Sequence, residues 1–319
     1  MSVDQLGRYV DPELERILAA LPPNPLGVDG YGVAEARADA ELAPTIDPPT
    51  GSGAGFTDLP AAADRPAVRI IAPDEPRPGR PCILWIHGGG YVAGSPFLTD
   101  ARLFRWAIEH DCVIVAVQYP LAPENPHPAG LEHCYAGLTW VWTNADELGI
   151  DSGRIAVAGE SAGGGLAAAL AIHARDRAEV PICFQLLIYP MLDDRTVADT
   201  DRADAPVWTK AANAVGWAAY LGEAADQPPV TAAPGRARPE QLRGLPPCFV
   251  SVGSLDLFRD EDIRYAQALQ DAGVPTELHV YAGTFHGSDH LVPEAAVSRR
   301  FERDLDVAIG RALRAPLKV

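Results

Sequence analysis

Seven short runs along the chain are enriched in apolar and β-branched residues, and most of them are apolar at almost every position, a pattern typical of strands. Strands of a parallel sheet are covered on both faces, so they read as continuous apolar runs without alternating polar positions. The pattern therefore predicts a mostly parallel, buried sheet. The runs are Val68–Ile71, Cys82–Ile86, Val113–Val117, Ile155–Ala158, Cys183–Tyr189, Cys248–Val252 and Glu277–Tyr281.

Helix-like segments separate these runs, so strand and helix alternate along the chain. Such alternation implies right-handed crossovers and a single sheet with helices on both faces. We expect this α/β sheet to extend from about Arg65 to the C-terminus. The helical segments are Thr99–Glu109, Gly130–Leu148, Ala162–Arg177, Asp260–Ala272 and Pro293–Leu313.

Two regions lie outside the alternation and predict a helical cap. Residues 1–64 contain a short amphipathic segment, Pro12–Leu21, and a further helical segment, Thr209–Leu221, interrupts the strand–helix order. Helices outside a sheet often form a lid over a site. We therefore predict an N-terminal cap segment over 1–64 and a catalytic domain over 65–319 with a cap insertion at about 191–225.

Charge and cysteine usage narrow the class of protein. The formal net charge of −17 argues against nucleic-acid partners and anionic membranes. No apolar run approaches the ~20 residues that span a bilayer, and Met1–Val10 lacks the features of a signal peptide. The five cysteines are scattered and form no CxxC pair, so we predict buried thiols in a reducing, cytoplasmic compartment.

The stretch Gly159–Gly163 reads G-x-S-x-G and lies between a strand-like and a helix-like run. A nucleophilic serine on a sharp strand-to-helix turn needs small neighbours, because side chains there would clash. The pattern predicts Ser161 as a nucleophile. Taken alone it also fits an ordinary glycine-rich turn.

A second glycine motif, His87–Gly90, follows the run Ile83–Ile86. Acyl transfer passes through an oxyanion, which needs N–H donors already in place. The N–H groups of Gly88, Gly89 and Ala162 are predicted to supply them. A flexible loop is the alternative, but two such motifs about 70 residues apart, each at a strand end, favour an acyl-transfer site.

A serine nucleophile needs a histidine base and an acid to orient it, in the chain order serine, acid, histidine. His286 follows a late strand within Thr284–Gly287, and Asp256 lies 30 residues before it, a gap that one helix and one strand would fill. Asp193 and Asp260 are the alternative acids, although Asp260 could instead cap a helix.

The remaining histidines are predicted to be structural or exposed. His286 and His290 are four residues apart, but no third ligand is evident, so we predict no metal site. The histidines without a glycine-flanked strand end are His110, His127, His133, His173, His279 and His290.

These motifs together resemble the hormone-sensitive-lipase-like branch of the α/β-hydrolases, which includes the bacterial family IV carboxylesterases. The resemblance covers about residues 66–315 and implies an α/β-hydrolase fold with a mostly parallel sheet and a helical cap. It also implies a triad of Ser161, Asp256 and His286, and no cofactor. The matching blocks are HGGG at His87–Gly90, YPLAPENPHP at Tyr119–Pro128, GESAGG at Gly159–Gly164, DLFRDED at Asp256–Asp262 and His286-Gly287.

The chain departs from the family pattern near the serine. Glu160 stands where the family usually has Asp, so we expect either a buried paired carboxylate or a contact with the oxyanion loop. His87, Gly90 and Glu160 are expected to support the site, and Glu124 to tie loops together by hydrogen bonds. The other departures are Gly165 for Asn, Pro120 for Arg and Leu257 for Pro.

The sequence thus predicts a serine carboxylester hydrolase that acts through an acyl-enzyme, and the family resemblance implies short- to medium-chain acyl esters as substrates. The expected partner is a small-molecule ester, and the family resemblance allows a homodimer. One alternative is a serine amidase or peptidase on the same fold. The other is a ligand-binding receptor of the gibberellin-receptor type, which lacks the triad histidine that His286 supplies here.

Overall fold

The computed structural model describes residues 9–21, 24–28, 31–41, 51, 53–196 and 205–314. These residues form one eight-stranded sheet in the order β1-β2-β4-β3-β5-β6-β7-β8. From β4 to β8 all neighbours are parallel, whereas β2 is antiparallel to both β1 and β4. The predicted mostly parallel α/β sheet is confirmed.

The strands lie close to the apolar runs of the sequence. They are β1 (Ala54–Leu59), β2 (Val68–Pro73), β3 (Arg80–Ile86), β4 (Val113–Val117), β5 (Ile150–Glu160), β6 (Phe184–Ile188), β7 (Cys248–Gly253) and β8 (Thr276–Tyr281). The helices are α2 (Glu15–Ala20), α3 (Val33–Glu41), α4 (Asp100–Glu109), α5 (Ala129–Thr143), α6 (Ala162–Arg177), α8 (Lys210–Leu221), α9 (Pro239–Leu242), α10 (Arg259–Asp271), α11 (Ser288–Leu291) and α12 (Ala296–Arg314).

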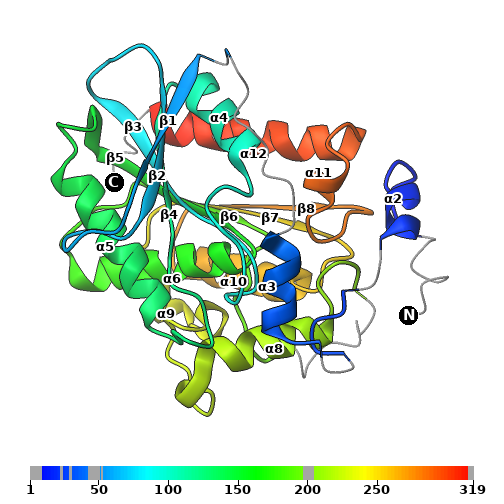
Figure 1. Cartoon of the computed structure of the whole chain (residues 1–319). Coiled ribbons are helices and arrows are strands. Elements are labelled where there is room, and N and C mark those ends of the chain that lie inside the picture. Colours follow the sequence, from blue (N-terminus) through cyan, green and yellow to red (C-terminus); the bar gives the residue numbers. More distant parts are fainter. Residues whose placement is uncertain are drawn as a thin grey trace.

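Helices cover both faces of the sheet, as Figure 1 shows. Helices α4 and α12 pack on one face, in a core that includes Trp85, and α5, α6 and α10 pack on the other, in a core that includes Leu84. Consecutive residues of a strand point to opposite faces. Strand β3 is therefore buried at every position, which explains its continuous apolar sequence.

Strand β1, helix α3 and the one-turn helices α9 and α11 have no counterpart in the expected order. Strand β1 pairs with β2, so the sheet begins at Ala54 and not at about Arg65. Four of the six β1 residues are exposed, so the strand carries no continuous apolar run. Helix α3 (VAEARADAE) alternates small and charged residues and shows no apolar stripe, which is why its sequence did not predict a helix.

The N-terminal segment lies against the strand ends of the sheet. The N–H of Asp11 donates to the carbonyl of Gly283, and Leu14 packs with Leu255 and Phe285. The amide of Asn24 donates to the carbonyl of Val207, so the two regions predicted as a cap contact each other. Residues 197–204 of the predicted cap insertion lie outside the described residues.

The five cysteines are free, and all but the half-buried Cys183 are buried. Among the described residues, no helix combines the length and apolar character needed to cross a membrane.

Candidate active site

The turn that carries Ser161, which we call the nucleophile turn after its predicted role, joins β5 directly to α6. Ser161 has φ 54° and ψ −122°, a strained backbone conformation for a residue with a side chain. A Cβ atom at Gly159 would lie 2.3 Å from the carbonyl oxygen of Gly163, and one at Gly163 would lie 2.1 Å from the carbonyl oxygen of Ile86. Both glycines are therefore required by close backbone approach, and the turn presents Ser161 at the carboxyl end of β5.

The structure brings Ser161, Asp256 and His286 together at the carboxyl ends of three strands. His286 Nε2 lies 3.1 Å from Ser161 Oγ, and His286 Nδ1 lies 2.8 Å from Asp256 Oδ2. The Asp256 carboxylate is fully buried and also accepts from the N–H of Phe258 at 3.0 Å. This is the geometry of a serine nucleophile, a base and an orienting acid.

The two alternative acids lie in other interactions. Asp193 accepts hydrogen bonds from the Arg195 side chain, and Asp260 accepts from Arg259 on the first turn of α10. Helix α10 receives no side-chain cap at its N-terminus, so the capping role considered for Asp260 is not realised.

Aromatic rings enclose the imidazole of His286, whose exposed fraction is 7%. The rings of Tyr189 and Phe258 meet it edge-on, with centroids 4.7 Å and 5.3 Å away. Such packing limits rotation of the imidazole. The hydrogen bonds to Asp256 and Ser161 are thus made by a ring with a fixed orientation.

Hydrogen bonds to carbonyl groups within the loop after β3 fix the conformation of that loop. Gly88 O accepts from His87 Nδ1 at 2.8 Å, and Gly89 O accepts from the N–H groups of Val92 and Ala93. In a trans peptide the C=O and the following N–H point in opposite directions. Fixing the Gly88 carbonyl therefore also fixes the direction of the Gly89 N–H. The N–H groups of Gly88 and Gly89 find no acceptor among the described residues.

Gly88 also lies directly beside Ser161. A Cβ atom there would lie 3.3 Å from the Ser161 Cβ, so the loop and the serine turn are in contact. A Cβ atom at Gly90 would lie 2.2 Å from the Trp208 ring. The tight packing at Gly90 places Trp208, from the predicted cap insertion, against the HGGG loop.

Glu160 is a paired carboxylate with a 12% exposed side chain, and its Cγ also lies 3.4 Å from where a Cβ atom of Gly88 would be, so both expected arrangements are present. Its Oε2 lies 2.9 Å from His290 Nε2 and 3.2 Å from Arg102 Nη1. Burial would raise the pKa of Glu160, but His290 and Arg102 outweigh it and the pKa is lowered.

The sequence pattern did not identify Arg102 as part of the site. A signal was available, because this arginine falls on the apolar side of α4 among Leu103, Trp106 and Ala107.

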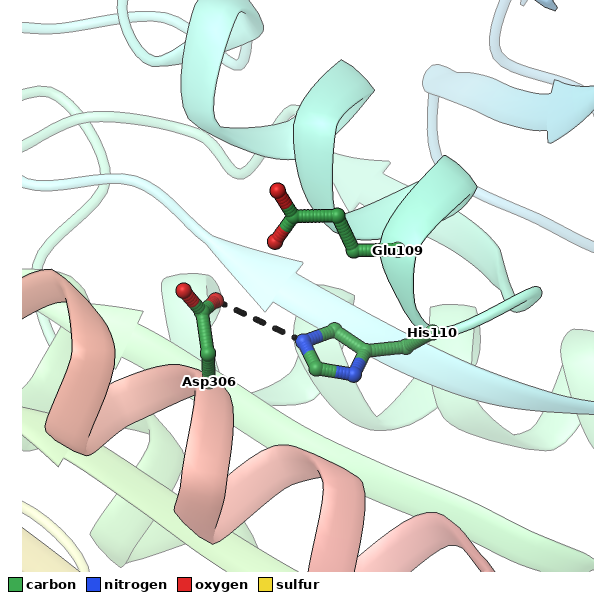
Figure 2. A group of neighbouring side chains, drawn as sticks. All are labelled: Glu109, His110 and Asp306. Atoms are coloured by element: carbon green, nitrogen blue, oxygen red, sulfur yellow. Dashed lines mark hydrogen bonds and ion pairs between the residues drawn. The ribbon is translucent and has the colours of Figure 1, made fainter.

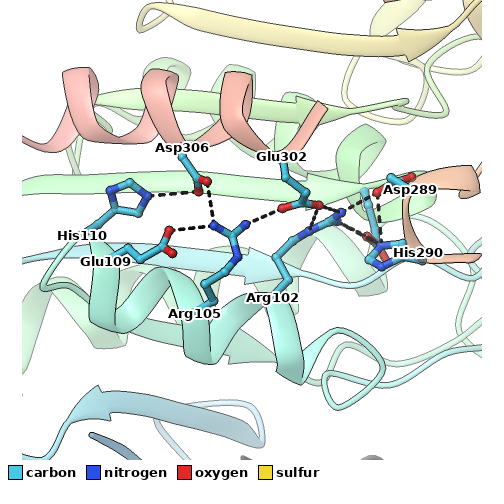
Figure 3. A network of polar contacts seen from close by, with 9 residues as sticks. Arg102, Arg105, Glu109, His110, Asp289, His290, Glu302 and Asp306 are labelled. Carbon is cyan, nitrogen blue, oxygen red and sulfur yellow. Dashed lines mark hydrogen bonds and ion pairs between the residues drawn. The ribbon is translucent and has the colours of Figure 1, made fainter. Parts of the chain in front are cut away.

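Polar side chains continue from Arg102 along the contact between α4 and α12, through Arg105, Glu302 and Asp306 (Figure 3). At its outer end Glu109, His110 and Asp306 bring three potential ligand atoms within 4.8 Å of one another, as Figure 2 shows. The Arg105 guanidinium donates to Glu109 and Asp306 at 2.7 Å and 2.6 Å. Arg105 thus already supplies the cation that balances these carboxylates.

Glu124 ties its own loop to Arg37 of α3, whereas it was expected to tie loops to one another. Both of its oxygens accept from Arg37 at 2.8 Å, and Arg37 also donates to the carbonyls of Val92 and Ala122.

At Gly165, where the family usually has Asn, a Cβ atom would lie 2.5 Å from the Tyr91 hydroxyl. That hydroxyl donates to Met191 O and fills the space of a larger side chain.

Comparison with known proteins gives consistent matches. A family model described as alpha/beta hydrolase fold matches residues 83–290. Carboxylesterase NlhH of Mycobacterium tuberculosis is 38% identical over 303 residues, which cover 90% of this chain and 92% of NlhH. Esterase LipI of the same organism is 43% identical over 210 residues, which cover 65% of this chain and 65% of LipI.

Solved structures of esterases superpose over almost the whole chain. A bacterial heroin esterase has a TM-score of 0.88 at 40% identity and covers 97% of this chain and 99% of its own. A hyperthermophilic esterase from the archaeon Pyrobaculum calidifontis has a TM-score of 0.81 at 30% identity, with coverage of 95% and 98%.

Proposed function

The chain belongs to the alpha/beta hydrolase family, in its hormone-sensitive-lipase-like branch, and from this membership we propose that it is a serine carboxylester hydrolase acting through an acyl-enzyme. The observation that supports the catalytic assignment is the unbroken hydrogen-bonded series from Asp256 through His286 to Ser161. The named carboxylesterases and esterases among its relatives support the ester as the bond that is cleaved.

In the proposed reaction Ser161 Oγ attacks the ester carbonyl carbon while His286 Nε2 takes the hydroxyl proton. Asp256 accepts from His286 Nδ1–H and stabilises the imidazolium that forms. The carbonyl oxygen becomes an oxyanion, which the N–H groups of Gly88, Gly89 and Ala162 stabilise by about 3 kcal/mol each.

The intermediate then collapses. The bond to the leaving alkoxide breaks, and His286 gives its proton to that oxygen. Water attacks the acyl-enzyme by the same steps, returns the proton to Ser161 and releases the carboxylic acid.

We propose a small-molecule ester of short to medium acyl chain as substrate. The contact of Trp208 with Gly90 supports a compact acyl site, and the packing of Leu14 beside Phe285 supports a cap formed by 1–64 and about 191–225. The scattered free cysteines support a cytoplasmic location. The homodimer rests on resemblance to the family.

Hydrolysis of p-nitrophenyl esters of increasing chain length tests the proposal. We expect turnover to peak at short to medium chains and to disappear in Ser161→Ala. The matched control is Ser152→Ala, at the opposite end of the same strand β5, which should keep wild-type activity. Absence of ester turnover, or equal turnover by Ser161→Ala, would refute the function, and a peak at long chains would indicate a lipase.

A further inference from the structure

Two consecutive residues of the nucleophile turn are each bridged to the segment that carries His286. Ser161 Oγ lies 3.1 Å from His286 Nε2, and Glu160 Oε2 lies 2.9 Å from His290 Nε2. His286 and His290 are separated by the first residues of the short helix α11. The catalytic hydrogen bond is therefore accompanied by a second bridge between the same two parts of the chain.

Arg102 is the residue that holds this second bridge together. From α4 its guanidinium donates to Glu160, beside the nucleophile, and to Asp289, in the segment that follows His286. It also donates to Glu302 on α12. The Arg102 side chain is only 5% exposed, so nearly all of its donor capacity is directed to protein groups (Figure 3).

Arg102 and the carboxylates around it stabilise one another in their charged forms. Burial would lower the pKa of Arg102, but Glu302 and Asp289 raise it well above its usual value. Burial would raise the pKa of Asp289, yet the cations beside it lower it. The pKa of His290 is also raised, because Asp289 and Glu160 outweigh both burial and the repulsion of the Arg102 charge. The Nε2–H of charged His290 donates to Glu160.

We propose that Arg102 is a positioning residue for the reaction, which holds the His286 segment against the nucleophile turn through Asp289 and Glu160. This inference rests on the proposed esterase function. Loss of Arg102 leaves His290 to balance both Asp289 and Glu160, and a buried charge that lacks its own partner is strongly destabilising. The most direct relief is movement of the segment 287–291 away from Glu160, which also moves His286.

Such a movement would affect the chemical step more than substrate binding. A misplacement of about 1 Å can lower a rate by about a hundredfold. If Arg102 only joined α4 to α12, its loss would lower the stability of the protein and leave the reaction rate unchanged. Arg105, one helical turn further along α4, contacts Glu302 and Asp306 but neither Glu160 nor Asp289. It is therefore a matched control.

The test compares Arg102→Met with Arg105→Met in the full chain, using kcat and KM for p-nitrophenyl acetate and the midpoint of thermal unfolding. We expect Arg102→Met to lower kcat about 10- to 100-fold with KM changed less than about threefold. Arg102→Lys should recover part of kcat, because one ammonium can still pair with one carboxylate. Arg105→Met should lower only the unfolding midpoint. Equal kcat in the two Met variants would overturn the proposal.

Two further measurements keep the result unambiguous. If Arg102→Met does not fold, Asp289→Asn breaks the same bridge from the His286 side, and wild-type kcat in that variant would overturn the proposal. The rate at which a fluorophosphonate labels Ser161 depends on His286 but not on ester turnover. A wild-type protein that is labelled but hydrolyses no ester would refute the esterase function, while a slower label in Arg102→Met would still support the positioning role.

Discussion

The imidazole of His87 stacks on the ring of Tyr119, with centroids 4.2 Å apart and planes inclined by 15°. The Tyr119 hydroxyl donates to His87 O, and His87 Nδ1 lies 2.8 Å from Gly88 O. Burial lowers the pKa of His87 to about 4, despite its hydrogen bond to Gly88 and the nearby charge of Glu160. The first residue of the HGGG loop is thus a neutral donor that orients the Gly88 peptide.

This depressed pKa predicts a loss of stability in acid. An unfolded histidine titrates near pH 6.5, so between pH 6.5 and 4 the unfolded state binds the extra proton. The free energy of unfolding should fall by up to about 1.4 kcal/mol per pH unit there, roughly 3 kcal/mol in total. His87→Asn keeps a donor but cannot titrate, so urea unfolding across this range should show a shallower pH dependence. The exposed His133→Asn should keep the wild-type slope, and an unchanged slope in His87→Asn would contradict the assignment.

Substitution by alanine is expected to have opposite effects on stability at Gly163 and at Gly310. In Gly163→Ala the new Cβ would lie 2.1 Å from Ile86 O and 2.4 Å from His87 O, which are backbone atoms that cannot move independently. We expect a loss of about 3 kcal/mol or more in unfolding free energy, together with loss of activity. Gly310 lies within α12, where a Cβ would meet only His110 at 3.8 Å. Gly310→Ala should raise the unfolding free energy by about 0.5–1 kcal/mol and keep the activity. A tolerated Gly163→Ala would show that the turn is less crowded than described.

The hydrogen bonds of Arg37 are expected to keep α3 attached to the rest of the molecule. Its guanidinium donates to Val92 O at 2.6 Å and to Ala122 O at 2.7 Å, in addition to its pair with Glu124. Arg37→Ala should make thermolysin cleavage near α3 about tenfold faster, because loss of charge-assisted bonds favours local opening. Glu124 is 60% exposed, so Glu124→Gln should change the rate less than about twofold. Equal cleavage of wild type and Arg37→Ala would show that other contacts hold α3.

The sequence predicted those features that depend on local pattern. Apolar runs indicated the strands from β2 to β7 and a less apolar run indicated β8, while glycine-flanked strand ends indicated Ser161 and His286 as candidates. Strand β1 was missed because its exposed edge residues need no apolar pattern. Arg102 was missed because its partners Asp289 and Glu302 are nearly 200 residues away, and only the fold brings them to α4. Long-range pairing of charged side chains leaves no periodic signal along the chain.

The assignment of Asp256 as the acid gives the sharpest prediction for catalysis. An Asn at this position could still accept from the N–H of Phe258, but its amide group would face His286 Nδ1. Nδ1 would then have to accept, and the proton would move to Nε2, where a lone pair is needed to take the proton of Ser161. We therefore expect Asp256→Asn to lower kcat about 10⁴-fold while the unfolding midpoint changes little. Asp260→Asn removes a carboxylate four residues away that pairs with Arg259 at the surface, and it should keep kcat within about twofold. Steady-state kinetics of the two variants on one p-nitrophenyl ester decide between them: a large loss in Asp260→Asn, or a small one in Asp256→Asn, would assign the acid elsewhere.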